Sequence, residues 1–233
     1  MPRIKPTKEA AAAILPSAKP RATTKNPKST SGKSRVIELP PIEEIVAMVQ
    51  IVGDTALLLN PFTAQVIEQL LAAQAGKKVQ KKAKSVPDEM AKRIQMLPGG
   101  KIGFSALAFK KAMMSATLSF KGMKTAHIKQ GCFIDPDGHD ENGCPLIALV
   151  SSKPEPLKAH VRNATGVADI RVRPMIRKWS CTLRMTITPS ILSLEAALSI
   201  LRVAGRSVGI GDWRPERCGD YGRFSIAKVE VMG

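Results

Sequence analysis

The chain of 233 residues carries 36 Lys and Arg residues against 19 Asp and Glu residues, a formal net charge of +17. Such an excess favours a polyanionic partner and argues against a neutral enzyme that has none. A hydrophobic fraction of 44% excludes a wholly disordered chain and allows one sizeable core. Because no run of 18 apolar residues and no signal-like segment is present, we expect a cytoplasmic protein that neither spans a membrane nor is secreted.

Cysteine and histidine spacing gives little support for metal or cofactor chemistry. The four cysteines contain no CxxC pair, so we expect reduced thiols, no metal and no cofactor. An acidic cluster at 135–141 lacks the spacing of a calcium loop. His139 lies in this acidic cluster, and none of the three histidines forms part of a recognisable Ser, Cys or carboxylate catalytic motif, so we expect no enzymatic activity. The histidines are His127, His139 and His160.

The positive charge is concentrated at the amino terminus. Residues 1–35 hold nine Lys or Arg residues and one acid, so they carry +8 of the +17. They contain five prolines and no aromatic residue, and such a segment cannot bury enough apolar area to offset its chain entropy. We therefore predict a disordered basic arm over residues 1–38, followed by one folded domain over residues 39–233.

The first half of this domain reads as a strand followed by helices. Residues 45–59 are rich in Val, Ile and Leu around Gly53 and Asp54, which predicts two strand segments about a turn. Apolar residues at helical spacing predict a helix over 63–75, and a short helix is predicted over 87–97. A further helix is predicted over 105–119, capped by Ser105, with Leu107, Ala108, Met114 and Leu118 on its apolar side.

The second half alternates between strands and one helix. Turn residues fill 135–145, and a buried strand is predicted over 146–151. Alternating apolar and polar residues predict antiparallel strands over 168–175 and 179–188, each with one solvent-exposed side that carries arginine. Ser193 is expected to cap a helix that ends at Gly205, before a closing strand over 223–231. This order predicts an α+β fold, a ferredoxin-like or RRM-like βαββαβ core with insertions between about 77 and 165.

The segment 205–224, GRSVGIGDWRPERCGDYGRF, combines three features of a polynucleotide-binding loop. It holds five of the 17 glycines, four arginines, and Trp213, Tyr221 and Phe224. Glycines let a backbone approach a phosphate chain, guanidinium groups bind its oxygens, and bases stack on aromatic rings for about 1–3 kcal/mol each. The alternative is an ordinary long turn whose aromatic rings fill the core, which we favour for Phe224 and weigh equally for Trp213.

Two motifs resemble those of the RAMP superfamily, the RNA-binding proteins of CRISPR systems. GIGDWRPERCGDYGRF at 209–224 looks like the glycine-rich loop that follows the second helix of the RAMP fold. IGFSALAFKKAMMSA at 102–116 is similar to the motif that the crRNA-coating backbone subunits place against guide phosphates, and VQIVGDTALLLNPF at 49–62 looks like their first strand. The resemblance implies RNA contacts by Lys110, Lys111 and the 209–223 loop.

An arginine-rich strand adds further candidate contacts. Arg171 and Arg173 are two residues apart, so on a strand they project from one face toward successive phosphates, or toward acids of the protein or of a neighbouring subunit. The complete set of predicted nucleic-acid contacts is Lys110, Lys111, Arg162, Arg171, Arg173, Arg177, Arg206, Gly209, Gly211, Trp213, Arg214, Arg217, Gly219, Tyr221, Gly222 and Arg223.

Together with these features, the resemblance to the RAMP superfamily implies a protein that holds a guide-like single-stranded RNA along its sheet and glycine-rich loop, within a ribonucleoprotein. The expected partners are that RNA, a complementary target RNA or DNA, and further copies of the chain along the same RNA. One alternative is a single-stranded DNA-binding or recombination accessory protein of a phage or mobile element. Another is a metal-independent endoribonuclease that uses His127 or His160.

Overall fold

The computed structural model describes residues 40–61, 67–68, 71–72, 74–76, 85–162 and 168–232, without the side chains of 161–162 and 168–169. A central antiparallel sheet is built from alternating sequences, with strand order β12-β1-β11-β5 and a short β8 paired with β11. Its strands are β1 (Ile45–Gly53), β5 (Cys132–Asp135), β8 (Val150–Ser151), β11 (Trp179–Ile187) and β12 (Phe224–Met232).

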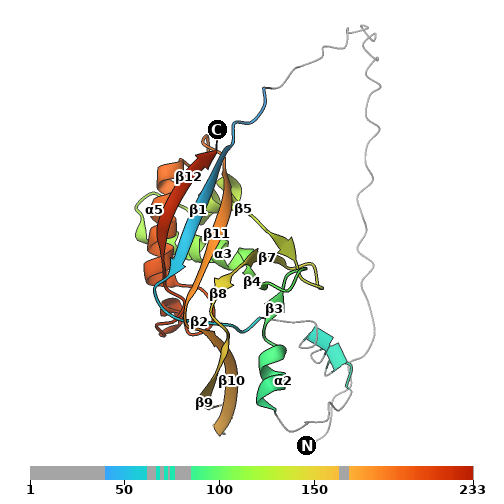
Figure 1. The fold of residues 1–233 in the computed structure, drawn as a ribbon. Coiled ribbons are helices and arrows are strands. Elements are labelled where there is room, and N and C mark those ends of the chain that lie inside the picture. Colours follow the sequence, from blue (N-terminus) through green and yellow to red (C-terminus); the bar gives the residue numbers. More distant parts are fainter. Residues whose placement is uncertain are drawn as a thin grey trace, which may run out of the picture. The chain divides into compact units, whose positions relative to one another are not determined.

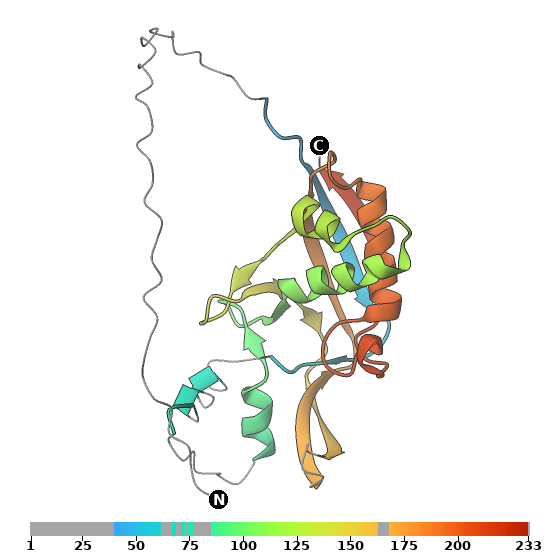
Figure 2. The same cartoon turned by 180° about the vertical axis from the view of Figure 1, so that it is seen from behind.

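Helices cover one face of this sheet, as Figure 2 shows. The two longest are α3 (Ala106–Ala116) and α5 (Leu194–Val203), which contact each other, and the shorter α4 (Thr125–Gly131) packs beside α3. The helices and the buried side of the strands enclose one core, since every second residue of β11 from Trp179 to Ile187 is buried. The chain order within this layer is β1, α3, β5, β11, α5, β12.

Two smaller antiparallel sheets adjoin the central one (Figure 1). The first consists of β2 (Leu57–Leu58), β9 (Glu155–Arg162) and β10 (Ala168–Ile176), and its β9–β10 hairpin extends away from the central sheet. The second consists of β3 (Gln95–Met96), β4 (Ile102–Ser105), β6 (Gly138–His139) and β7 (Pro145–Ala148). Helix α2 (Val86–Ala91) precedes β3, and short helical turns occupy η1 (Thr117–Ser119) and η3 (Pro215–Arg217).

The predicted α+β class is confirmed, and most long elements lie where the sequence places them. The predicted strands at 45–59, 168–175, 179–188 and 223–231 are present, and the hydroxyl of Ser193 accepts the Ala196 N–H at 3.2 Å to cap α5. Within 63–75 the described residues 67–68, 71–72 and 74 are helical. The predicted arm at 1–38 lies outside the described residues. The described residues of Pro41–Gly233 form one compact unit.

Four local predictions are wrong. Ser105 stands at the N-cap position of α3, but its side chain makes no capping hydrogen bond. The buried side of α3 consists of Ala106, Phe109, Ala112, Met113 and Ala116, whereas Leu107 and Leu118 are exposed. Gly205 does not end α5, because the chain continues as a π-helical turn, η2 (Ala204–Val208), and the left-handed glycine that closes it is Gly209. The helix predicted over 87–97 stops at Ala91, since Gln95 and Met96 pair with β4 instead.

Candidate nucleic-acid interface

The glycine-rich loop is a folded structure fixed to β2 and to the connection that precedes it. The N–H of Asp212 donates to the carbonyl of Leu58 at 3.0 Å, and the N–H of Gly222 donates to that of Ala56 at 2.8 Å. Across the loop, the N–H of Ile210 donates to the carbonyl of Gly222 at 2.9 Å. Many of its backbone donors are thus used within the protein, so the loop is held in place before any ligand binds.

Two glycines show why the loop needs this composition. Gly222 has φ +67°, and a Cβ there would lie 1.8 Å from the carbonyl oxygen of Ile210. Gly211 has φ +81°, and its Cβ would lie 2.6 Å from the carbonyl oxygen of Leu58. Both residues therefore allow backbones to pack closely, which is a role within the fold. The other predicted loop glycines also lie against this folded backbone; they are Gly209 and Gly219.

The aromatic residues of the loop divide between core and surface. Phe224 is buried, and its ring centroid lies 5.7 Å from that of Phe109 and 6.3 Å from that of Trp179. Trp213 and Tyr221 are half-buried, and their ring centroids are 6.2 Å apart. Phe224 is thus a core residue, as we favoured. Trp213 and Tyr221 instead leave part of their side-chain surface exposed to solvent.

A groove runs between α3 and the glycine-rich loop, with a volume of about 710 Å³. We call it the α3 groove. Its lining joins the two motifs singled out in the sequence, because Lys111 of α3 lies on it together with Arg214 and Arg217 of the loop. The remaining lining residues are Asn60, Ala108, Ala112, Met114, Ser115, Leu118, Thr125, Gly209, Ile210, Gly211 and Glu216.

A smaller hollow of about 300 Å³ continues the α3 groove toward the start of α3. The two share Asn60, Ala108, Gly211 and Arg214, so they form one depression. Arg93 and Gln95 line the smaller hollow, and neither they nor Asn60 were among the predicted contacts. No motif in the sequence marks Arg93 or Gln95, and Asn60 lies only in the first-strand motif at 49–62, so the fold was needed to place them at this site.

Lys110 and Lys111 point in different directions. Lys111 is exposed on the α3 groove, whereas the Nζ of Lys110 donates to the carbonyl of Lys129 at 3.1 Å and lies 4.5 Å from the centre of the Phe133 ring. Neighbouring residues of a helix are about 100° apart around its axis, which explains the divergence. Of the two predicted lysines, only Lys111 therefore lines the α3 groove.

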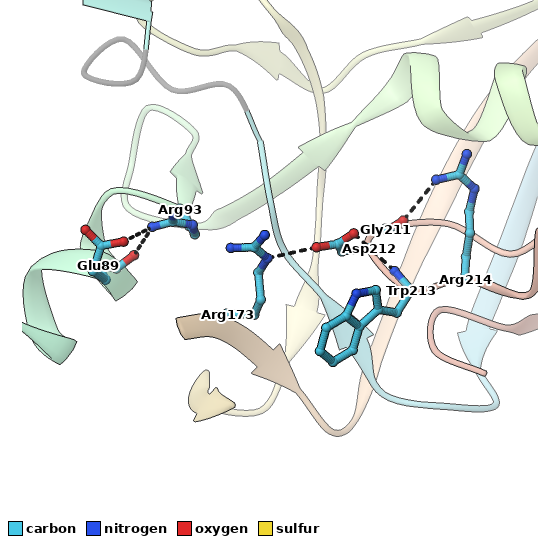
Figure 3. A network of polar contacts seen from close by, with 7 residues as sticks. All are labelled: Glu89, Arg93, Arg173, Gly211, Asp212, Trp213 and Arg214. Carbon is cyan, nitrogen blue, oxygen red and sulfur yellow. Dashed lines mark hydrogen bonds and ion pairs between the residues drawn. The ribbon is translucent and has the colours of Figure 1, made fainter. Parts of the chain in front are cut away.

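Several predicted arginines bind the protein's own acids. The Nε of Arg173 lies 2.8 Å from Asp212, and the Arg173 side chain is only 7% exposed (Figure 3). Arg177 pairs with Glu155 at 2.9 Å, and Arg223 pairs with Asp220 at 3.0 Å. Arg173 thus connects β10 to the loop and has almost no surface left for a ligand.

Arg214 is held at the edge of the α3 groove by two contacts. Its guanidinium donates to the carbonyl of Gly211 at 3.2 Å, as Figure 3 shows, and pairs with Glu216 at 2.5 Å. Contacts from the Ser115 side chain and from Arg214 lower the pKa of Glu216 despite its partial burial, so this carboxylate is ionised at neutral pH. The Ser115 contact also connects the loop to α3.

The remaining predicted arginines are exposed or lie at the edge of the described residues. Arg217 lines the α3 groove, and Arg206 lies on η2 at a different pocket. Arg171 is exposed on β10. Arg162 ends β9, but its side chain is not among those described.

The open face of the central sheet offers a weaker site for a polyanion. Its Arg184 lies 3.3 Å from Asp135, and Lys228 pairs with Glu230. Phe133 is its only exposed aromatic side chain among the residues of β1, β5, β11 and β12. Positive charge and free surface therefore coincide at the α3 groove more than on the sheet.

Searches of protein-family models and of curated proteins find no match. Among solved structures, a chain of the Type III-B Cmr-beta complex, seen by cryo-EM bound to cognate target RNA, matches with TM-score 0.46 and 12% sequence identity. The match covers 81% of this chain and 61% of that one, so this chain spans about three fifths of its length. Cmr6 from Pyrococcus furiosus matches with TM-score 0.40 and 11% identity, over 80% of this chain and 100% of Cmr6.

No helix among the described residues is long and apolar enough to cross a membrane. Within the same residues, no group of three or more His, Cys, Asp or Glu side chains is placed to hold a metal ion.

Proposed function

We propose that this chain binds single-stranded RNA, and that the sugar-phosphate backbone of the strand lies in the α3 groove. The observation that carries the proposal is the convergence of two motifs about 100 residues apart, which brings Lys111, Arg214 and Arg217 to one depression. A groove with cations along it and apolar area between them suits a polynucleotide strand, whose phosphates repeat and whose bases are largely apolar.

The half-buried Trp213 and Tyr221 supply aromatic surface on the same loop. Bases stack on such rings with little sequence preference, so the protein would hold many sequences equally well. Sequence recognition would then come from base pairing with a complementary target strand. We propose that the bound RNA is guide-like and stays available for such pairing, within a ribonucleoprotein that holds several copies of this chain.

The proposed domain organisation follows from the strand order. We propose that the β1-α3-β5-β11-α5-β12 layer, with order β12-β1-β11-β5, is a ferredoxin-like core. Residues 77–165 then contribute α3 and β5 to this core as well as the smaller β3-β4-β7-β6 sheet. The basic segment 1–38 would add contacts to the RNA phosphates, since nine of its residues are Lys or Arg.

We propose binding without cleavage. The Nδ1 of His127 accepts the N–H of Lys124 at 3.3 Å, within the first turn of α4, and His160 lies on the exposed side of β9. Neither histidine lines the α3 groove, so neither is placed to take a proton from a strand bound there.

Substitution of the groove cations tests this proposal. Lys111→Ala and Arg217→Ala should each weaken RNA binding at every sequence and lower the salt dependence, log Kd against log salt, by about one unit of slope. Fluorescence anisotropy with a labelled RNA oligomer over a range of salt concentrations measures both effects. The matched control is Lys228→Ala, which removes the same charge from β12, outside the groove.

Equal losses in Lys111→Ala and Lys228→Ala would contradict the groove assignment, because they would indicate a diffuse electrostatic effect. Competition with a DNA oligomer of the same sequence tests the choice of RNA, since only RNA carries the 2′-hydroxyl. A DNA oligomer that competes equally would favour the single-stranded DNA-binding alternative. Incubation of the wild-type protein with RNA in the absence of metal, followed by gel analysis, tests cleavage.

A further inference from the structure

A second basic depression lies where α5 runs into η2 beside the start of β12. Its volume is about 640 Å³, and we call it the α5 pocket. It shares no lining residue with the α3 groove. The lining residues are Asp54, Arg202, Arg206, Ser207, Arg223, Phe224, Ser225 and Ile226.

Three arginines line the α5 pocket. Arg202 is in the last turn of α5 and Arg206 follows four residues later, so the two lie on one side of the helix. The π-helical turn of η2, closed by a hydrogen bond from the Gly209 N–H to the Ala204 carbonyl at 2.8 Å, leaves Arg206 and Ser207 exposed. Among the residues that the structure describes, Arg202 and Arg206 form no ion pair with a carboxylate within 4.0 Å.

The pocket keeps a positive charge after its acids are counted. Asp54 lines it, and its Oδ1 accepts the hydroxyl of Ser225 at 2.8 Å. Asp220, outside the lining, binds one nitrogen of Arg223 at 3.0 Å. Three arginines against two carboxylates leave one uncompensated positive charge, and cations one helical turn apart repel each other. A bound anion would remove that repulsion.

Arg223 carries an unused donor. Its Nε is buried and has no hydrogen-bond partner, the one side-chain atom of this kind in the described part of the chain. Native proteins rarely leave such a donor unpaired, and an unpaired one often marks the place of a water or an ion. A small rotation of the side chain, which is 40% exposed, would offer Nε and Nη2 together to an oxyanion in the fork geometry typical of arginine.

We infer that the α5 pocket is a phosphate-binding site, formed by Arg202, Arg206 and Arg223 with the hydroxyl of Ser207. Guanidinium groups from α5, from η2 and from the residue before β12 fit a tetrahedral anion, whose several oxygens each accept hydrogen bonds. The phosphate could belong to the backbone or an end of a polynucleotide, or to a free phosphorylated molecule. The inference does not rest on the function proposed for the α3 groove, because the two sites share no residue.

Titration of the full-length protein with inorganic phosphate, at constant ionic strength in chloride, tests the site. The arginine Nε–H signals of Arg202, Arg206 and Arg223 should shift in NMR spectra and reach saturation. In the double variant Arg202→Gln/Arg206→Gln the phosphate affinity should fall about tenfold or more, because two charge-assisted contacts are lost. Arg177→Gln, at the β10–β11 turn, is the control and should leave the affinity unchanged.

Absence of saturable shifts in the wild-type protein would overturn the inference, and so would an unchanged affinity in the double variant. Thermal unfolding of each variant shows whether a loss reflects the fold instead of the site. Lys111→Ala should leave phosphate binding intact, which separates this test from that of the groove. RNA oligomers with 5′-phosphate, 3′-phosphate or hydroxyl ends, used as competitors, then identify the source of the phosphate.

Discussion

At the scale of single residues, Gly222 shows how the glycine-rich loop depends on the absence of a side chain. Gly222→Ala should destabilise the protein by about 1–2 kcal/mol for the left-handed backbone alone. The contact of its Cβ with the Ile210 carbonyl, at 1.8 Å, adds to this cost. Urea denaturation followed by circular dichroism measures the free energy of unfolding.

The matched control is Gly122→Ala. Gly122 has φ +78°, but a Cβ at this position would meet no other atom within 4 Å, so only the backbone term applies. Equal losses in the two variants would show that the close backbone contact in the loop contributes nothing.

At the scale of elements, the Arg173–Asp212 ion pair connects the β9–β10 hairpin to the glycine-rich loop. Arg173→Ala would leave the Asp212 carboxylate without its partner, next to groove residues that must stay in place. We expect a loss of about 1–3 kcal/mol in the free energy of unfolding, because the variant loses the packing of the buried Arg173 side chain and its charge-assisted hydrogen bond to Asp212. Weaker RNA binding should accompany it, because the loop would lose one of its supports.

Arg177→Ala provides the comparison for the same measurements. Arg177 pairs with Glu155 at a similar distance, but both side chains are about half exposed or more. Exposed pairs contribute about 0–1 kcal/mol, so this variant should remain close to wild type in stability. A larger loss in Arg177→Ala than in Arg173→Ala would contradict the supporting role of Arg173.

At the scale of the whole molecule, two buried thiols make the stability of the fold depend on pH in the alkaline range. Burial raises the pKa of Cys132 to about 11 and that of Cys181 to about 12, from an ordinary value of 9.0. A thiol whose folded pKa is raised stabilises the fold fully below the unfolded pKa, and this contribution is lost as pH rises toward the folded pKa. Stability should therefore fall above pH 9, by up to about 1.4 kcal/mol per pH unit for each thiol.

Comparison of wild type with Cys132→Val/Cys181→Val isolates this effect from the titration of lysines. Denaturation at several pH values between about 7 and 11 should show a shallower decline in the double variant. Cys218→Ser, at an exposed thiol of the loop, should follow wild type. A wild-type decline no steeper than that of the double variant would contradict the assignment.

The local periodicity of the sequence accounts for much of the fold. The alternating residues of β11 and the Ser193 cap of α5 are local signals, because each depends on residues close together in the chain. The apolar side of α3 was harder to predict, since Leu107 and Leu118 are exposed although they are more apolar than the buried Ala106 and Ala112. Short strands such as β3 and β4 gave too few residues for a periodic signal.

The sequence by itself determined the α+β class, the main elements, the excess of positive charge and the two motifs that suggest RNA. Only the tertiary structure decided which cations remain available. Asp212 is 39 residues from Arg173 and Glu155 is 22 residues from Arg177, so no local pattern could show that these charges are paired. The same long-range packing brings Lys111 to Arg217 and gathers Arg202 with Arg223, because a groove forms only where distant segments fold against each other.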